Sequence, residues 1–291
     1  MMNSPAMNRN PYLVDDQPPA LRGSVFAFID ILGYRELIQA SQATGTQQET
    51  LRKLHAALLA GRQWLQDDDD VTPQLRDLFT KDRYALKAFT DNIVIGWPVR
   101  DDAESEFGDA FFRLGAFQLQ LVLEGFFLRG AISVDYAYID EIAVFGEALT
   151  EAYVGESTLS RDPRIILTAS GVRAARGHLT YYSDPSRAPH VRDLLRDADG
   201  QWFLNYLQTI LMAEEEQGPF YEEFHRHKIA VEDKLREYKR NPPIWSKYAW
   251  VAGYHNYFCD LHSQHFGEEH RIDVGLFKIG PALIVDDEMN P

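Results

Sequence analysis

The feature that most constrains the fold is an apolar run near the N-terminus, SVFAFIDILG at residues 24–33. Its aromatic and β-branched residues, closed by Gly33, are typical of a central strand that is buried on both faces and runs into a turn. Asp30 interrupts this run. Since an unpaired buried carboxylate costs several kcal/mol, we expect Asp30 to have a cation or a metal ion as its partner, or to lie at a strand end.

Further along the chain, apolar residues recur at helical and strand spacings in turn. The expected elements are two helices over 35–66, a hairpin over 84–97, a helix over 107–125, a second hairpin with strands over 128–134 and 136–145, a helix over 147–159, a strand over 164–168, a short helix over 170–176, a strand over 201–210 and a helix-rich segment over 219–265.

This order predicts an α+β fold, with a mixed, mostly antiparallel sheet and helices packed on one of its faces. Residues 1–21, rich in Asn, Pro and Asp, are expected to form a flexible N-terminal arm. Residues 22–212 would then form the main domain, and residues 213–291 a helical C-terminal extension packed on the same domain.

The chain of 291 residues carries 29 Lys and Arg against 44 Asp and Glu, which gives a net charge of −15. Such an acidic protein repels nucleic-acid backbones and anionic lipids, so neither is expected as its main partner. The single cysteine, Cys259, excludes a disulfide framework and a multi-cysteine zinc site. No apolar run reaches about 18 residues and the N-terminus lacks the pattern of a signal peptide, so we expect a cytoplasmic protein.

A second aspartate stands at the tip of the first hairpin. Residues 84–89 and 93–97 are β-like, and Thr90-Asp91-Asn92 is the turn between them. Two carboxylates at the ends of adjacent strands make a platform for two divalent cations about 3.5–4 Å apart, which can hold a triphosphate and activate a hydroxyl for in-line attack. Oxygen ligands suit Mg²⁺ or Mn²⁺. Taken alone, Asp91 also fits an ordinary Asp-Asn turn.

Five segments, in the same order, resemble the motifs of class III nucleotidyl cyclases, and most closely those of the Pycsar antiphage pyrimidine cyclases. They are residues 28–34 (FIDILGY), 90–95 (TDNIVI), 129–133 (RGAIS), 145–153 (FGEALTEAY) and 163–166 (PRII). The family similarly reads F-x-D-I-L-G-[FY], [ST]-D-N-I-V-I, R-G-A-I-S, F-G-x-A-L-x-E-A-Y and P-R-I-I. The resemblance covers about residues 22–170 and is weaker over the helical C-terminal third.

The resemblance implies a class III nucleotidyl cyclase-like fold with two Mn²⁺ or Mg²⁺ ions in each active site. Asp30 and Asp91 would bind both ions, with the Ile31 carbonyl as a further ligand. It also implies a head-to-tail homodimer with shared active sites, in which one chain supplies the metals and the other the base contacts. The substrate would be a pyrimidine nucleoside triphosphate. Its 3′,5′-cyclic product would activate a separate effector protein during phage infection.

The chain departs from the family at one helix. Class III enzymes place Asn and Arg four and eight residues after the helix-opening glycine, Gly146 here, and those positions hold Thr150 and Val154. Three cations are candidates to replace the transition-state arginine: Arg129, Arg161 and Lys81. A cyclase-like domain that binds a nucleotide without turnover is therefore an alternative. A polymerase is disfavoured by the net charge, and a diguanylate cyclase by the absence of a Gly-Gly-Asp/Glu-Glu-Phe signature.

Base choice is expected to depend on Lys87 and Phe28. In the resembling motif the lysine four residues before the hairpin aspartate reads the base. An ammonium offers only donors, so it pairs with O4 of uracil and opposes the amino group of cytosine. Phe28 shares a strand face with Asp30 and would narrow the pocket against purines. We therefore expect UTP to become cyclic UMP, while contact of Lys87 with cytosine O2 would reverse the choice to CTP.

The histidines do not predict a metal site. His225 and His227 are two residues apart, so they face apart on a helix. One helical stripe carries His255, Cys259, His262 and His265. Because that stripe spans about 15 Å and aromatic residues interleave with it, we expect a packing helix there rather than a zinc site.

Overall fold

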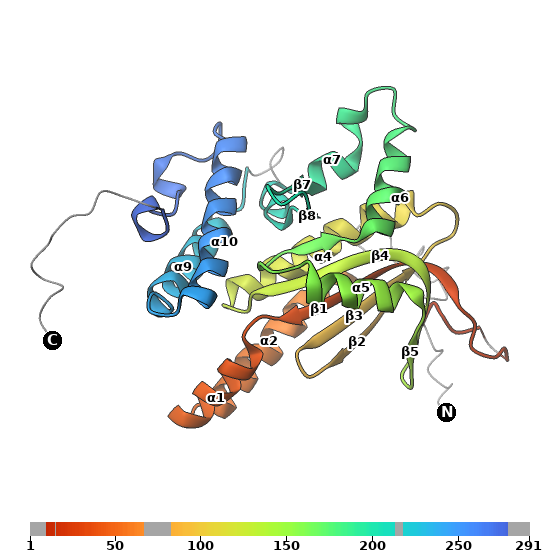
Figure 1. The fold of residues 1–291 in the computed structure, drawn as a ribbon, viewed down its shortest axis with the longest axis horizontal. Coiled ribbons are helices and arrows are strands. Elements are labelled where there is room, and N and C mark those ends of the chain that lie inside the picture. The colour runs from red at the N-terminus through yellow and green to blue at the C-terminus, as the bar shows by residue number, and fades with distance from the viewer. Residues whose placement is uncertain (1–9, 15, 67–82, 213–217, 279–291) are drawn as a thin grey trace, which may run out of the picture.

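The computed structural model describes residues 10–14, 16–66, 83–212 and 218–278. Its eight strands form one twisted sheet (Figure 1). The strands are β1 (Arg22–Ile31), β2 (Ala85–Phe89), β3 (Asn92–Pro98), β4 (Leu128–Ile139), β5 (Val144–Phe145), β6 (Ile165–Leu167), β7 (Leu194–Arg196) and β8 (Trp202–Leu204). The first predicted hairpin lies within the described residues, whereas the acidic residues 67–70 and the candidate cation Lys81 lie outside them.

Helices connect and cover these strands. The α-helices are α1 (Tyr34–Thr44), α2 (Gln47–Gln66), α4 (Glu104–Leu123), α5 (Glu147–Thr158), α6 (Ala169–Leu179), α7 (Pro189–Asp193), α9 (Tyr221–Glu237) and α10 (Pro242–Leu261). The 3₁₀ helices are η1 (Pro185–Arg187), η2 (Tyr206–Leu211), η3 (Glu268–His270) and η4 (Val274–Leu276).

The sheet has the strand order β2-β3-β1-β4-β6-β8-β7, and β5 pairs with β4 outside this path. Every pairing is antiparallel except that of β4 with β6. The predicted α+β class, with a mixed and mostly antiparallel sheet, is therefore confirmed. The apolar run at residues 24–33 supplies β1, which lies between β3 and β4 near the middle of the sheet, as its composition predicts.

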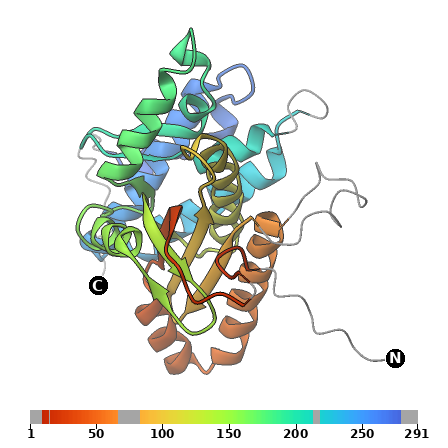
Figure 2. The ribbon, with the colours of Figure 1, turned by 90° about the vertical axis from the view of Figure 1, so that its right-hand side faces the viewer.

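Both faces of β1 are covered by helices. Val25, Ala27 and Ile29 face the core formed with α2 and α4, and the alternate residues Phe26 and Phe28 face a second core formed with α5. Figure 2 shows α2 and α5 on opposite sides of the strands. The expectation of helices on one face only is wrong, because a central strand that is apolar on both faces needs cover on both.

Three other expected boundaries differ. The break predicted near residue 135 is absent, because β4 keeps pairing with β1 as far as Ala137. The chain turns at Asp140 and Glu141, inside the strand predicted over residues 136–145, and the returning strand β5 is only two residues long. The strand predicted over residues 201–210 ends at Leu204 and gives way to η2, whose Leu207, Ile210 and Leu211 are spaced to pack on one helical face.

The described segments before β1 and after η2 pack on the same body. Within the predicted flexible arm, Tyr12 is buried and its hydroxyl donates a hydrogen bond to Ser24 Oγ at 2.8 Å. The helices α9 and α10 lie together at one end of the molecule (Figure 1) and share a core with Leu119 of α4 and with Phe127. Within the described residues, no helix has the length and apolar character needed to cross a membrane.

Candidate active site

The two predicted metal ligands lie at the same end of the sheet. Asp30 is opposite Asn92 in the pairing of β1 with β3, so it lies beside the tip of the β2–β3 hairpin. At that tip the carbonyl of Asp91 accepts a hydrogen bond from the backbone N–H of Ile31 at 3.0 Å. Backbone pairing alone therefore places Asp30 and Asp91 next to each other, although 61 positions separate them in the sequence (91 − 30).

Neighbouring side chains at the hairpin tip orient the Asp91 carboxylate. Its Oδ1 accepts hydrogen bonds from Thr90 Oγ1 at 2.8 Å and from Asn92 Nδ2 at 3.0 Å. Thr90 has a φ of 57°, which is unusual for a β-branched residue. Such conformations concentrate at functional sites, where surrounding contacts hold them. The tip is thus a shaped turn that presents one carboxylate beside Asp30.

Arg129 is the counter-ion of Asp30. The two residues are directly opposite in the pairing of β1 with β4, so their side chains share one face. Arg129 Nε donates a hydrogen bond to Asp30 Oδ2 at 2.9 Å. Asp30 therefore has two of the features expected for a carboxylate in an apolar strand: a cation as its partner and a position one residue from the end of β1.

A third carboxylate, from Glu156, completes the cluster, and the sequence reasoning missed it. Glu156 Oε1 lies 2.8 Å from Arg129 Nε, but that N–H is directed to Asp30, so Oε1 accepts no hydrogen bond from a described group. Glu156 is 4% exposed. The available signal is its place on the buried stripe of α5, four residues after Ala152.

Gly155 allows α5 to deliver Glu156 to the sheet. A Cβ at position 155 would lie 2.9 Å from both Ala131 Cβ on β4 and Thr168 Cγ2. Real Cβ atoms essentially never approach so closely, so only glycine permits this helix–sheet contact. The small residues on this face of α5 therefore let the helix pack close to the sheet, and this determines how deeply the Glu156 carboxylate is buried.

The cluster carries more negative than positive charge. Burial raises the pKa of Asp30; the nearby Arg129 opposes this, and the charge of Asp91 adds to it. Burial also raises the pKa of Glu156, again opposed by Arg129 and reinforced by Asp30 and Asp91. Asp30 and Asp91 supply neighbouring carboxylate oxygens, the kind of ligand that hard divalent cations prefer. The residues present therefore fit Mg²⁺ or Mn²⁺.

The structure gives Phe28 and Lys87 partners outside this cluster. Phe28 is 6% exposed, and its ring packs edge-to-face against Tyr153 at 5.4 Å between centroids. Lys87 Nζ donates to the carbonyl oxygens of Asp140 and Glu141 at 3.3 and 3.0 Å, in the turn between β4 and β5. Both residues are opposite Val94 in their strand pairings, so they share a row of one sheet face. Among the described residues, Lys87 forms no hydrogen bond or ion pair with Asp30 or Asp91.

Of the candidate replacements for the missing arginine, Arg129 is part of the site. Arg161 has an 82% exposed side chain and pairs with the adjacent Asp162, and Lys81 lies outside the described residues. Val154 is exposed on α5, and Thr150 hydrogen-bonds within its own helix. A cation that the sequence did not indicate, Lys247 of α10, lies close enough to lower the pKa of Asp30.

Two pairs of histidines are joined by hydrogen bonds, His178 with His190 and His227 with His255. His227 Nδ1 lies 3.0 Å from His255 Nδ1, and the two rings stack with an interplanar angle of 5°. Cys259 is buried. Across the described ranges, no group of three or more His, Cys, Asp or Glu side chains is arranged to hold a metal ion. The Asp30–Asp91 platform would thus need the Ile31 carbonyl and a substrate to complete a coordination shell.

No protein-family model matches this chain, and no curated protein matches it significantly. The assignment of a function therefore depends on the site itself and on the resemblance of its motifs.

Proposed function

We propose that this chain is a pyrimidine nucleotide cyclase that converts UTP to 3′,5′-cyclic UMP and diphosphate. The observation that carries the proposal is the pair of aspartates at the ends of adjacent strands, Asp30 and Asp91, joined through the Ile31–Asp91 backbone hydrogen bond. Asp30, Asp91 and the Ile31 carbonyl would hold two Mn²⁺ or Mg²⁺ ions. Such ions lower the pKa of the attacking hydroxyl and neutralise the leaving group.

In the proposed reaction the ribose 3′-oxygen attacks the α-phosphorus. The bond from that oxygen to phosphorus forms, the bond from the α-phosphorus to the bridging oxygen of the β-phosphate breaks, and the hydroxyl proton passes to solvent. Diphosphate leaves with the electron pair. The reaction needs no further reactant, which is consistent with a site made of carboxylates and two cationic side chains.

Arg129 has a role that follows from its contacts. In the free site its Nε–H is used by Asp30, and Glu156 stands 2.8 Å away as a second anionic partner. When Asp30 serves as a ligand, Arg129 retains Glu156, and its terminal N–H groups remain for phosphate oxygens. Guanidinium groups are strong partners of phosphate. Glu156 would thereby position Arg129 rather than touch the substrate.

The start of α1 also suits a phosphate. Gly33 has a φ of 73° and turns the chain from β1 into α1, and no side chain caps the helix N-terminus. Free N–H groups at a helix N-terminus favour anions. This turn begins three residues after Asp30, so the phosphates of a bound nucleotide would have both ligands and backbone donors in reach.

A homodimer is the proposed active state. Large apolar side chains are exposed on one connected part of the chain, on β4, β5, their turn and α5: Tyr136, Ile142, Phe145, Tyr153 and Val154. Ile142 is 90% exposed and Phe145 66% exposed. Contiguous exposed apolar surface is typical of an interaction site. Lys87 is bound to the turn that carries Ile142, so the residue to which the resemblance assigns the base contact lies beside the proposed dimer surface.

The proposed product is a messenger made in the cytoplasm for a separate effector protein that acts against phage. Two alternatives remain. CTP would replace UTP if Lys87 contacts O2 of the base. One observation favours binding without turnover: the Asp30 carboxylate, a proposed metal ligand, is already paired with Arg129.

Phosphorus NMR of the reaction with UTP and Mg²⁺ separates these functions. A cyclase produces diphosphate and the cyclic phosphodiester in equimolar amounts, so the diphosphate signal has twice the intensity of the phosphodiester signal, because diphosphate contains two equivalent phosphorus atoms. A triphosphatase would release orthophosphate instead, and a non-catalytic binding domain would leave the UTP signals unchanged. Either of those outcomes, with folded and dimeric protein, would overturn the proposal.

A further inference from the structure

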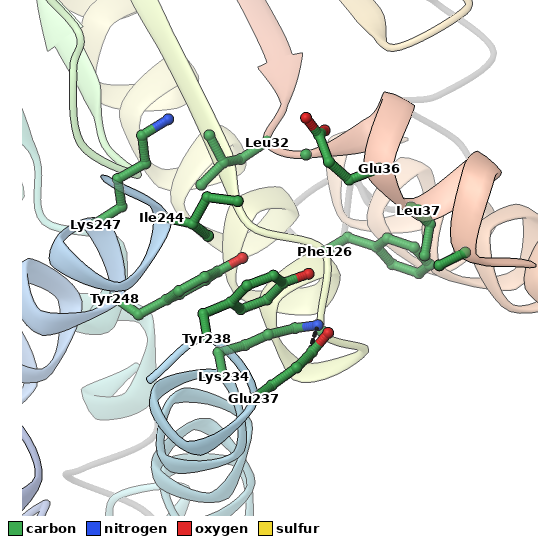
Figure 3. A pocket seen from close by; sticks show the side chains of 13 residues that line it. Leu32, Glu36, Leu37, Phe126, Lys234, Glu237, Tyr238, Ile244, Lys247 and Tyr248 are labelled. Carbon is green, nitrogen blue, oxygen red and sulfur yellow. Dashed lines mark hydrogen bonds and ion pairs between the residues drawn. The ribbon is translucent and has the colours of Figure 1, made fainter. Parts of the chain in front are cut away.

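The C-terminal extension carries a cationic side chain close to the proposed site. The helix α10 begins after Asn241 and carries Lys247 on its second turn. Lys247 is half-buried and lines a pocket of about 170 Å³ between α1, the α4–β4 turn, α9 and α10. In Figure 3 the ammonium of Lys247 and the carboxylate of Glu36 extend toward the same rim of this pocket, on either side of Leu32.

Packing fixes the position of α10 relative to Asp30. Leu32 donates its backbone N–H to the carbonyl of Phe127 at 2.8 Å, which ties the end of β1 to the start of β4. The Phe127 ring packs edge-to-face against Tyr248 at 5.0 Å, and Tyr248 is also stacked at 5.6 Å on Tyr238, the residue that follows α9. Lys247 is the residue before Tyr248. Its backbone is therefore held beside the end of β1 by a buried aromatic contact.

The ammonium of Lys247 has charged neighbours but no direct partner. In the described ranges no group forms a hydrogen bond or an ion pair with it. Burial lowers the pKa of Lys247 and the charge of Arg129 adds to this, whereas Asp162, Asp30 and Glu36 oppose it. A half-buried cation beside a guanidinium is stabilised when an anion binds between the two.

We infer that Lys247 binds phosphate oxygens of the nucleotide, so that the C-terminal extension supplies a cation to the active site of its own chain. The inference rests on the proposed function for the identity of the ligand. Lysine binds phosphate as a compact point charge. Lys247 and Arg129 would together offset the charge of a triphosphate held at Asp30.

Lys234 provides a matched control in the same pocket. Its Nζ is already paired with Glu237 at 2.7 Å and lies over the Tyr238 ring at 5.5 Å. The variants are Lys247→Met, Lys247→Arg and Lys234→Met. Each is characterised by its melting temperature, by kcat and KM with UTP, and by calorimetric binding of diphosphate in the presence of Mn²⁺.

We expect Lys247→Met to weaken diphosphate binding and to raise KM for UTP by about tenfold, which is typical for the loss of a hydrogen bond to a charged group. Its melting temperature should not fall, because Lys247 forms no bond in the free protein. Lys247→Arg should recover most of the affinity, and Lys234→Met should match the wild type. Unchanged diphosphate binding in Lys247→Met, or equal losses in Lys234→Met, would overturn the inference.

The two proposals fail separately. If the wild type converts no triphosphate but Lys247→Met still weakens diphosphate binding, the cyclase proposal is wrong and the anion site stands. If the wild type forms a cyclic nucleotide and Lys247→Met behaves like the wild type in both measurements, the cyclase proposal stands and the role of Lys247 is wrong.

Discussion

The backbone N–H of Ile31 donates a hydrogen bond to the carbonyl of Asp91 at 3.0 Å. This single contact joins the end of the central strand to the tip of the neighbouring hairpin, and so brings two carboxylates together by main-chain geometry. The side chains of Asp30 and Asp91 take no part in this backbone link. Their replacement should change chemistry without changing the fold.

The first prediction concerns these two carboxylates. Asp30→Ala and Asp91→Ala should each leave less than a few per cent of the cyclase activity, because the divalent cations lose a charged ligand. Asp30→Asn should have the same effect while keeping the volume of the side chain. The melting temperature of each variant should stay close to that of the wild type.

Activity above a few per cent in either alanine variant, measured with purified and folded protein, would refute the two-aspartate assignment. A strong loss of stability would instead show that the carboxylates hold the strands together.

The second prediction concerns assembly. Ile142→Asp should convert a homodimer into a monomer and abolish turnover, because a charge would replace the most exposed apolar side chain of the β4–β5 turn. Leu51→Asp on α2, which likewise replaces an exposed apolar side chain but lies away from this turn, is the control and should remain dimeric. Sedimentation velocity gives the mass of each variant.

Shared sites have a sharper test in mixed chains. A heterodimer of an Asp91→Ala chain with a Lys87→Ala chain contains one site with both residues intact, if the metals and the base contact come from opposite chains. Recovery of activity on mixing is expected. Inactivity of a verified heterodimer would mean that each chain builds its own site.

The third prediction concerns base choice. Wild-type protein should prefer UTP to CTP in kcat/KM, because the Lys87 ammonium donates to uracil O4 and meets a donor on cytosine. Lys87→Ala should bring the two values closer together. A wild-type preference for CTP, or the same ratio in Lys87→Ala, would show that another group reads the base.

Much of the fold and half of the site follow from sequence. The apolar run at residues 24–33 predicts a central strand, and the hairpin predicted around Asp91 has its turn at Thr90–Asp91. Local patterns suffice here because strand periodicity and turn chemistry act over a few residues. The same patterns predict that β1 is buried on both faces, but they do not predict that a helix covers the second face, since that depends on where α5 packs.

The rest of the site could not be predicted, because it depends on contacts between distant segments. Glu156 is brought to the site by the close approach of α5 to β4 at Gly155. Lys247 is brought near it by the aromatic contact of Tyr248 with Phe127. Arg129 was one of three candidate cations, and only strand register singles it out. Tyr12 lies in a polar segment, yet a hydrogen bond to Ser24 anchors it in the core.

A fourth prediction concerns acid stability. His227 and His255 form a buried neutral chain, in which Tyr206 Oη lies 2.7 Å from His227 Nε2 and His255 Nε2 lies 2.9 Å from the carbonyl of His270. Burial lowers the pKa of His255 to about 4 and that of His227 well below its ordinary value. The unfolded chain binds these protons near pH 6.5, so folding stability is lost as the pH falls from about 6.5 toward 4.

Melting curves between pH 7 and 4.5 check this prediction. His255→Asn should lower the melting temperature at pH 7 but flatten its decline with acid, whereas the exposed His55→Asn should leave the decline as in the wild type. Parallel declines for wild type and His255→Asn would show that the buried pair does not set the acid limit.

The central claim is tested most directly by the products formed from each of the four ribonucleoside triphosphates with Mn²⁺, identified by mass spectrometry. The account predicts 3′,5′-cyclic UMP from UTP with wild-type protein, little or no cyclic product from ATP or GTP, and none from any of the four with Asp30→Ala. Absence of every cyclic nucleotide with folded, dimeric wild-type protein, or equal yields from wild type and Asp30→Ala, would contradict it.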